Sequence, residues 1–294
     1  MGELVATAVV AHQPMVMVPK KVRVALGGSG ADTTLIEPGF RWLREGFDKL
    51  GVDTFVIIDT HWFTTTEHVI AGANHFRGNY TSEEMPRNIC DLPYDYPGAP
   101  ELAAAWHGVC KERGLFTINV TAPSLPQHYA TLNLVEHLRS DQRVLSCGVV
   151  QTGERDDFLA LGAALGEAIR RAEDARVAVL GSGGMSHTFW PLSQIREHFA
   201  YDPAHVISPE ARAVDAEILE LWAQGDHAAV LARYPEYLKR FKPEGRFAHY
   251  LMALGAMGGP ECRAPGAQLS SYENAVGTGQ VHVLFDLTRD EAGR

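Results

Sequence analysis

The chain has 294 residues, of which 46% are hydrophobic and 21% charged, a composition that excludes intrinsic disorder and a coiled coil. A formal net charge of −10 argues against a broad nucleic-acid or anionic-membrane surface but leaves room for a local basic pocket. No apolar run approaches the roughly 20 residues of a membrane span. The N-terminal segment lacks the basic region of a signal peptide, and the four cysteines are widely spaced. We therefore expect a cytoplasmic protein with reduced thiols.

Short apolar runs rich in β-branched residues alternate along the chain with helix-like patterns. The predicted strands are Leu4–Ala11, Thr54–Ile58, Val144–Val150, Val177–Leu180 and Val281–Leu287. The predicted helices are Pro38–Leu50, Pro100–Gly114, Asp157–Ala172, Pro209–Ala223 and Phe247–Met257. This alternation predicts a single α/β domain over residues 1–294, with a mostly parallel or mixed central sheet flanked by helices.

Two stretches of the chain fall outside this alternation. Residues 75–97 lack a clear period, so we expect a long functional loop or an insertion at a sheet edge. From about Thr288 onward, we expect a frayed acidic tail.

Two glycine clusters, Gly27–Gly30 and Gly181–Gly184, superficially resemble phosphate-binding loops. Neither completes the GxGxxG pattern, and neither carries the GK[ST] that a P-loop requires. The clusters therefore do not predict a nucleotide site.

Three predicted strands run into a histidine at or just past their carboxyl ends, namely His12, His61 and His187. Ligands of open α/β sheets bind outside the carboxyl ends of the strands, where side chains of neighbouring strands can converge on one atom. This geometry suits a metal ion if a carboxylate or water completes the coordination. A single histidine at a strand end is more often a hydrogen-bonded loop residue than a metal ligand, and the two interpretations balance only because three strands of one chain end in this way.

The same residues carry a resemblance to a known family, the class III extradiol ring-cleavage dioxygenases of the protocatechuate 4,5-dioxygenase catalytic-subunit type. The matching segments follow the family order over nearly the whole chain. They are His12, Asp53–Trp62, His75–Ser82, Pro123–Leu125, Gly181–His187, Pro235–Tyr237, Glu244–Gly245 and Gly277–Val281. The resemblance implies a metal site at the carboxyl ends of the strands, with Fe(II) as the cofactor and His12, His61 and Glu244 as its ligands. Two histidines and one carboxylate form the facial triad of non-haem Fe(II) oxygenases.

By the same resemblance, His187 is the acid/base residue, since an imidazole near pH 7 can take up and return a proton. The alternative is a structural histidine bonded to a loop carbonyl. Around Gln127–Thr131 the sequence departs from the family pattern, because Ala130 stands where relatives carry glycine. We expect Tyr129 to contact substrate or oxygen, and a one-residue shift in the alignment would give that role to His128.

Asp59 lies two residues before His61 and would share its side of a continuous strand, where it either orients a ligand imidazole or caps a turn. The implied reaction inserts both atoms of O2 into a catechol, with 3,4-dihydroxyphenylacetate as the first candidate and another catechol or a 2-aminophenol as alternatives. Arg77, Arg87 and Arg246 are candidates for binding a substrate carboxylate. A homo-oligomer, dimer or tetramer, is the expected assembly. A zinc-dependent hydrolase and a non-enzymatic binding protein of the same fold are the rival interpretations.

Overall fold

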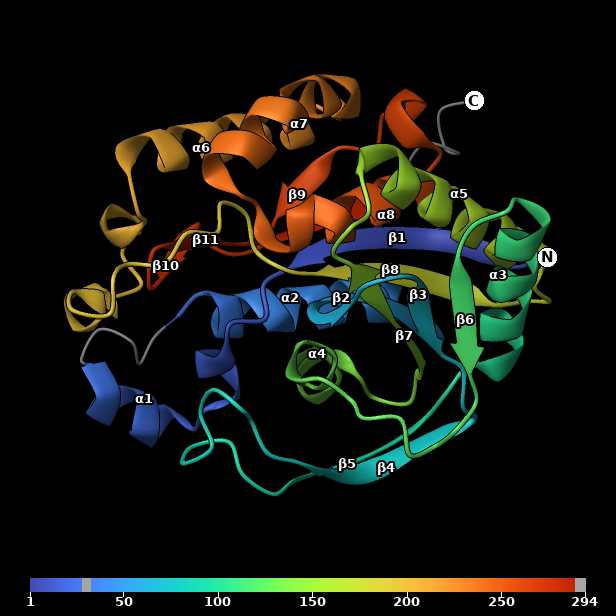
Figure 1. Cartoon of the computed structure of the whole chain (residues 1–294), viewed down its shortest axis with the longest axis horizontal. Coiled ribbons are helices and arrows are strands. Elements are labelled where there is room, and N and C mark those ends of the chain that lie inside the picture. The colour runs from blue at the N-terminus through green and yellow to red at the C-terminus, as the bar shows by residue number, and fades with distance from the viewer. Residues whose placement is uncertain (28–32, 289–294) are drawn as a thin grey trace.

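A mixed eight-stranded sheet divides the molecule into two helical layers in the computed structural model, which describes residues 1–27 and 33–288 (Figure 1). The strand order is β6-β3-β7-β2-β8-β1-β12-β9. The pairs β1–β8, β2–β8, β2–β7 and β3–β6 are parallel, whereas β12 is antiparallel to both β1 and β9, and β3 is antiparallel to β7. The sheet strands are β1 Glu3–Val10, β2 Thr54–Thr64, β3 His68–Ala71, β6 Thr117–Val120, β7 Arg143–Val150, β8 Arg176–Ser182, β9 Gly266–Gln268 and β12 His282–Asp286.

Helices cover both faces of the sheet because its central strands are apolar on both sides, as strands of parallel sheets are. In β2, Val56 and Ile58 pack into one hydrophobic core, while Phe55 and Ile57 pack into the other. The first core is completed by α3 Pro100–Glu112, α5 Arg155–Arg171, α6 Pro209–Ala223, α7 His227–Phe241 and α8 Ala248–Ala256. The second is completed by α2 Arg41–Lys49 and α4 Tyr129–Leu138, which lie on the opposite face in Figure 1.

Smaller elements complete the fold. A helix α1 (Lys20–Gly27) follows the 3-10 turn Pro14–Met17, and a two-stranded hairpin is formed by β10 Glu273–Ala275 and β11 Thr278–Gln280. No helix within residues 1–27 and 33–288 has the length and apolar character that a bilayer span requires.

The structure confirms the predicted α/β class, and each predicted strand and helix overlaps an observed one. Residues 75–97, expected as a long functional loop or a sheet-edge insertion, form a separate antiparallel hairpin of β4 His75–Tyr80 and β5 Leu92–Pro97, joined by a loop over residues 81–91. This hairpin lies outside α4 rather than at the edge of the main sheet (Figure 1). Most of the cluster Gly27–Gly30 and the tail after Thr288 lie outside the described residues.

The carboxyl ends of three adjacent strands meet at one residue of β8. Ser182 pairs with Val10 of β1 on one side and with Asp59 of β2 on the other. His12 lies two residues beyond Val10, and His61 lies two residues beyond Asp59. Strand register therefore brings two distant histidines to the same edge of the sheet.

Candidate active site

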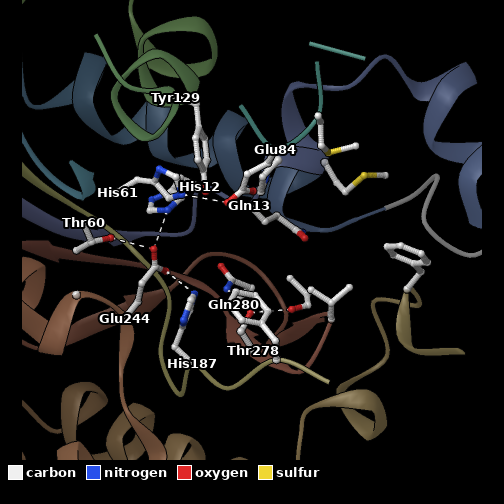
Figure 2. Close-up of a pocket in the computed structure, with 18 of the residues that line it drawn as sticks. His12, Gln13, Thr60, His61, Glu84, Tyr129, His187, Glu244, Thr278 and Gln280 are labelled. Atoms are coloured by element: carbon white, nitrogen blue, oxygen red, sulfur yellow. Dashed lines mark hydrogen bonds and ion pairs between the residues drawn. The ribbon is translucent and has the colours of Figure 1, made fainter. Parts of the chain in front are cut away.

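A cavity of about 540 Å³ opens at this edge, and Figure 2 shows the polar side chains that gather in it. Five of the residues selected from the sequence line it: His12, His61, Tyr129, His187 and Glu244. A volume of this size lies within the range of small-molecule sites, roughly 300–1,000 Å³.

The His12 ring is buried and held by hydrogen bonds at both nitrogens. Its Nδ1 lies 2.9 Å from Ser182 Oγ, and its Nε2 lies 2.9 Å from Glu244 Oε1. Ser182 has one hydroxyl proton and donates it to the Ala130 carbonyl, so Ser182 Oγ accepts from the Nδ1–H of His12. Such a partner fixes the orientation of a ligand imidazole and leaves Nε2 facing the site. Burial alone would lower the pKa of His12, but the Glu244 charge and hydrogen bond outweigh it and raise that pKa.

Glu244 reaches the site from a turn with unusual backbone geometry. After α7, Lys242, Gly245, Arg246 and Phe247 all have positive φ, which is costly for the three residues that carry a Cβ. At Gly245 a Cβ would lie 2.6 Å from Thr60 Cγ2, so the turn passes too close to β2 for any larger residue. Backbone outliers of this kind concentrate at functional sites, where the surrounding structure enforces them.

The Glu244 carboxylate is buried and surrounded by donors. It accepts a hydrogen bond from the Gly184 amide at 2.6 Å and shares the single hydroxyl proton of Thr60 (3.0 Å) with the Ser182 carbonyl (2.8 Å), besides its contact with His12. Burial would raise the pKa of Glu244, but the charge of His12 and the hydrogen bonds from His12 and the Gly184 amide hold that pKa well below its usual range. A buried carboxylate that stays ionised is a ready ligand for a divalent cation.

His61 is aimed by a bulge in β2. The regular pairing of β2 with β7 shifts between Asp59 and Phe63, and the Asp59 carboxylate accepts hydrogen bonds from the amides of His61 (2.9 Å) and Trp62 (3.0 Å). Asp59 therefore caps the bulge rather than bonding an imidazole. The His61 Nε2 faces Glu84 Oε1 at 3.2 Å, and this hydrogen bond lowers the pKa of Glu84.

His187 enters the cavity from the loop after β8. Its Nε2 lies 3.7 Å from Glu244 Oε2, and its ring packs edge-on against Phe189. Burial lowers the pKa of His187, and this effect outweighs the charge of Glu244, which would raise it. The imidazole is therefore neutral at pH 7. A neutral imidazole in a cavity can accept a proton from a bound molecule.

The two aromatic candidates at the start of α4 face different surroundings. Tyr129 is buried, lines the cavity and contacts both histidine ligand candidates, with its ring centroid 4.2 Å from that of His61 and 5.3 Å from that of His12. His128 occupies the N-cap position of α4 without a capping hydrogen bond from its side chain; its ring stacks on Trp62 and does not line the cavity. The structure thus brings Tyr129 together with the other site residues and does not bring His128 there.

The donor set of His12, His61 and Glu244 fits a divalent metal by its chemistry. Within residues 1–27 and 33–288, no three His, Cys, Asp or Glu side chains already have the arrangement of a formed metal site. The reason is visible in Figure 2: His12 and Glu244 bond each other, and His61 turns to Glu84. Each of these donor atoms faces a partner inside the same cavity, where a cation would compete for it.

Sequence reasoning missed several residues of the site. Thr60 and Glu84 contact the ligand candidates, and Arg23 is the only lysine or arginine among the described cavity residues. None stood out, because Thr60 is an ordinary strand residue and the other two lie outside the strand ends. The three arginines expected to bind a substrate carboxylate do not line the cavity. Arg77 is exposed beside Asp95, Arg87 is exposed, and Arg246 donates to the Gly153 carbonyl.

Comparison with known proteins identifies the class to which this site belongs. Residues 7–285 match the family described as the catalytic LigB subunit of aromatic ring-opening dioxygenase, and the chain belongs to this family of non-haem extradiol dioxygenases. The family implies a metal-dependent reaction of an aromatic substrate with O2.

Individual relatives agree with this assignment. The chain is 30% identical over 264 residues to a 3,4-dihydroxyphenylacetate 2,3-dioxygenase of Escherichia coli, a match that covers 88% of this chain and 91% of that protein. Among solved structures, an uncharacterized protein of Escherichia coli K12 matches with a TM-score of 0.57 and 14% identity, over 96% of this chain and 99% of the other. The second likeness supports the fold alone.

Proposed function

We propose that the chain forms one catalytic domain, an Fe(II)-dependent extradiol dioxygenase that cleaves 3,4-dihydroxyphenylacetate to a 2-hydroxymuconic semialdehyde bearing a carboxymethyl group. The observation that carries the proposal is the convergence of His12, His61, Glu244 and His187 on one cavity. The relative of 30% identity, named for this reaction, supports the choice of substrate.

His12, His61 and Glu244 would hold the iron, in keeping with the facial triad of two histidines and one carboxylate. When bound, ferrous iron would bring the catechol oxygens and O2 together and carry the electron transfer between them. The hydrogen bond from His12 to Ser182 fixes the ring that presents Nε2. Gly184 and Thr60 donate to Glu244 and hold its carboxylate in place.

His187 is the proton carrier in this proposal. Because its pKa is lowered by burial, its imidazole is free to accept a catechol proton at neutral pH and return it later in the reaction. Tyr129 has a pKa raised by burial, so its phenol stays protonated and serves as a hydrogen-bond donor to substrate or oxygen. His128 is the alternative for that role, although its ring stacks outside the cavity.

The remaining cavity wall suits an aromatic acid. Met15, Met85 and Phe189 offer apolar surface for the ring of the substrate. Arg23 is buried, donates to the Val18 carbonyl and supplies the guanidinium that the substrate carboxylate would meet.

The proposal is tested by anaerobic loading with ferrous iron, followed by addition of 3,4-dihydroxyphenylacetate in air. We expect one O2 consumed per substrate and the appearance of a yellow semialdehyde. His61→Ala and Glu244→Ala should bind little iron, whereas His187→Phe should keep iron and catechol binding but lose about 10²-fold or more in kcat. Iron-loaded protein that consumes no O2 with a panel of catechols and aminophenols would refute the proposal.

Assembly and location complete the proposal. We infer a cytoplasmic homo-oligomer, a dimer or tetramer, since most soluble oligomers are homo-oligomers with closed symmetry. Sedimentation velocity at micromolar concentration measures it, and a monomer there would contradict it.

A further inference from the structure

A buried carboxylate lies behind the cavity and has no part in the reaction described above. Asp215 projects from α6, is fully buried and does not line the cavity. Its oxygens accept hydrogen bonds from Ser186 Oγ at 2.6 Å, Tyr237 Oη at 2.7 Å and Tyr272 Oη at 2.6 Å. The Ser186 amide adds a longer contact of 3.3 Å to both oxygens. All of these donors are neutral.

The segment held by Asp215 is the loop that carries His187. Met185 donates to the Gly279 carbonyl at 2.8 Å, and the Gly279 amide donates back to Ser186 at 2.9 Å. The Glu244 amide donates to the Met185 carbonyl at 3.1 Å. One three-residue loop therefore sets the backbone of both the proton carrier and the carboxylate ligand candidate.

The opposite side of the carboxylate is occupied by β11. A Cβ at Gly279 would lie 2.4 Å from Asp215 Oδ2 and 2.4 Å from Tyr272 Oη, so only glycine allows this approach. The residues on either side, Thr278 and Gln280, line the cavity beside His187 (Figure 2). Asp215 of α6 thus contacts α7, β11 and the loop that carries His187.

Burial of the Asp215 carboxylate costs free energy. Burial raises the pKa of Asp215 to about 6, because the hydrogen bonds from the Ser186, Tyr237 and Tyr272 hydroxyls offset the loss of hydration only in part. An apolar residue would avoid this cost, whereas a fully hydrogen-bonded polar network fixes one arrangement of the groups around it. The choice of a carboxylate here favours accurate placement over stability.

We propose that Asp215, through Ser186 and with Tyr237 and Tyr272, is a positioning residue that sets the placement of the His187 imidazole against the substrate. This inference rests on the proposed function, since it assigns a purpose to the network through the proton-transfer role of His187. A displacement of about 1 Å in a reacting group can cost on the order of 10²-fold in rate.

Two single-atom deletions test the proposal. Tyr237→Phe removes one donor to Asp215, and Tyr250→Phe is the matched control, because Tyr250 is equally buried but bonds His227 Nδ1 at 2.9 Å. Each variant loses one hydroxyl from a buried ring, so we expect similar losses of Tm. We measure kcat, KM and iron per chain with iron-loaded enzyme. Tyr237→Phe should lower kcat at least fivefold with KM and iron content within twofold of wild type, whereas Tyr250→Phe should leave all three within twofold.

Asp215→Asn extends the series, because it keeps the shape of the side chain and exchanges one acceptor oxygen for an NH2 group. We expect a larger loss of kcat than in Tyr237→Phe, with iron still bound. Equal kcat in Tyr237→Phe and Tyr250→Phe would reduce the network to a stabilising role and overturn the inference.

A second readout separates this inference from the proposed function. If wild-type protein cleaves no catechol, the proposed function fails. The placement of His187 can still be measured in metal-free protein, from the rate at which diethyl pyrocarbonate modifies its imidazole. A rate at His187 altered more than twofold in Tyr237→Phe but not in Tyr250→Phe supports the positioning of the loop. Equal rates in the three proteins overturn it.

Discussion

Replacing Asp59 tests how the bulge in β2 is held. Asp59 is fully buried and accepts three hydrogen bonds, from the amides of His61 and Trp62 and from the Thr131 hydroxyl at 2.7 Å. Asp59→Ala removes all three acceptor contacts. Asp59→Asn keeps an oxygen for the two amides, and its NH2 group can donate to Thr131 Oγ1.

The magnitude follows from the donors left behind. The Trp62 amide and the Thr131 hydroxyl are buried, and each buried donor without a partner costs about 1–3 kcal/mol. The His61 amide is only partly buried, so water can replace its lost partner at lower cost. We therefore expect Asp59→Ala to lower the free energy of unfolding by about 3–5 kcal/mol and Asp59→Asn to lower it by about 1 kcal/mol.

Urea unfolding, followed by the fluorescence of the buried Trp106 and Trp222, measures both values. A double-mutant cycle isolates the side-chain pair: Thr131→Val should cost about 1–2 kcal/mol less in the Asp59→Ala background than in wild type. A loss below about 1 kcal/mol in Asp59→Ala, or an equal loss in Asp59→Asn, would refute this account of the bulge.

Three further predictions concern the site and its support. The pKa of Asp215, raised to about 6, means that its stabilising contribution is full below about pH 4 and is lost as the pH rises through 6. In wild type the free energy of unfolding should therefore fall by about 3 kcal/mol more between pH 4 and pH 7 than in Asp215→Asn, as measured by urea unfolding. An equal fall in the two proteins would contradict this prediction. Gly184→Ala places a Cβ 2.9 Å from the backbone carbonyl oxygen of Gly279 and should cost about 1–3 kcal/mol and most of the bound iron. Gly108→Ala, with open space at that position, should cost neither in Tm and metal assays. Arg23→Met should raise KM for 3,4-dihydroxyphenylacetate at least tenfold and leave KM within twofold for 4-methylcatechol, which has no carboxylate. Equal changes in the two KM values would show that Arg23 does not bind the substrate carboxylate.

The strand-end histidines could be predicted from sequence because parallel strands place their carboxyl ends together. His12 and His61 follow apolar runs directly, and the pairing of both strands with Ser182 brings their ends to one edge. Glu244 had no such signal. It sits in a left-handed turn after a helix, where no hydrophobic period points to it, so only family resemblance selected it.

The sequence analysis did not predict α4 or α7, and each omission has a local cause. Pro235 interrupts the pattern of α7, although the helix forms around it. Seven of the ten residues of α4 are buried, including Asn133 and Thr131, so the helix lacks a polar face that would reveal its period. Residues 75–97 pair with each other rather than with the main sheet, and this pairing left no clear alternation in the sequence.

The position of β12 has a consequence for the order in which the protein folds. Strand β1, which leads to His12, pairs with β8 on one side and with β12 on the other. The Ala11 amide donates to His282 Nδ1, a residue 271 positions later in the sequence. A ribosome must therefore release almost the entire chain before this edge of the sheet can close. Contacts so distant in sequence make folding slow, since the entropy of a long loop is lost before the contact forms. If His12 holds a metal as proposed, loading would follow chain release and would not guide the nascent chain.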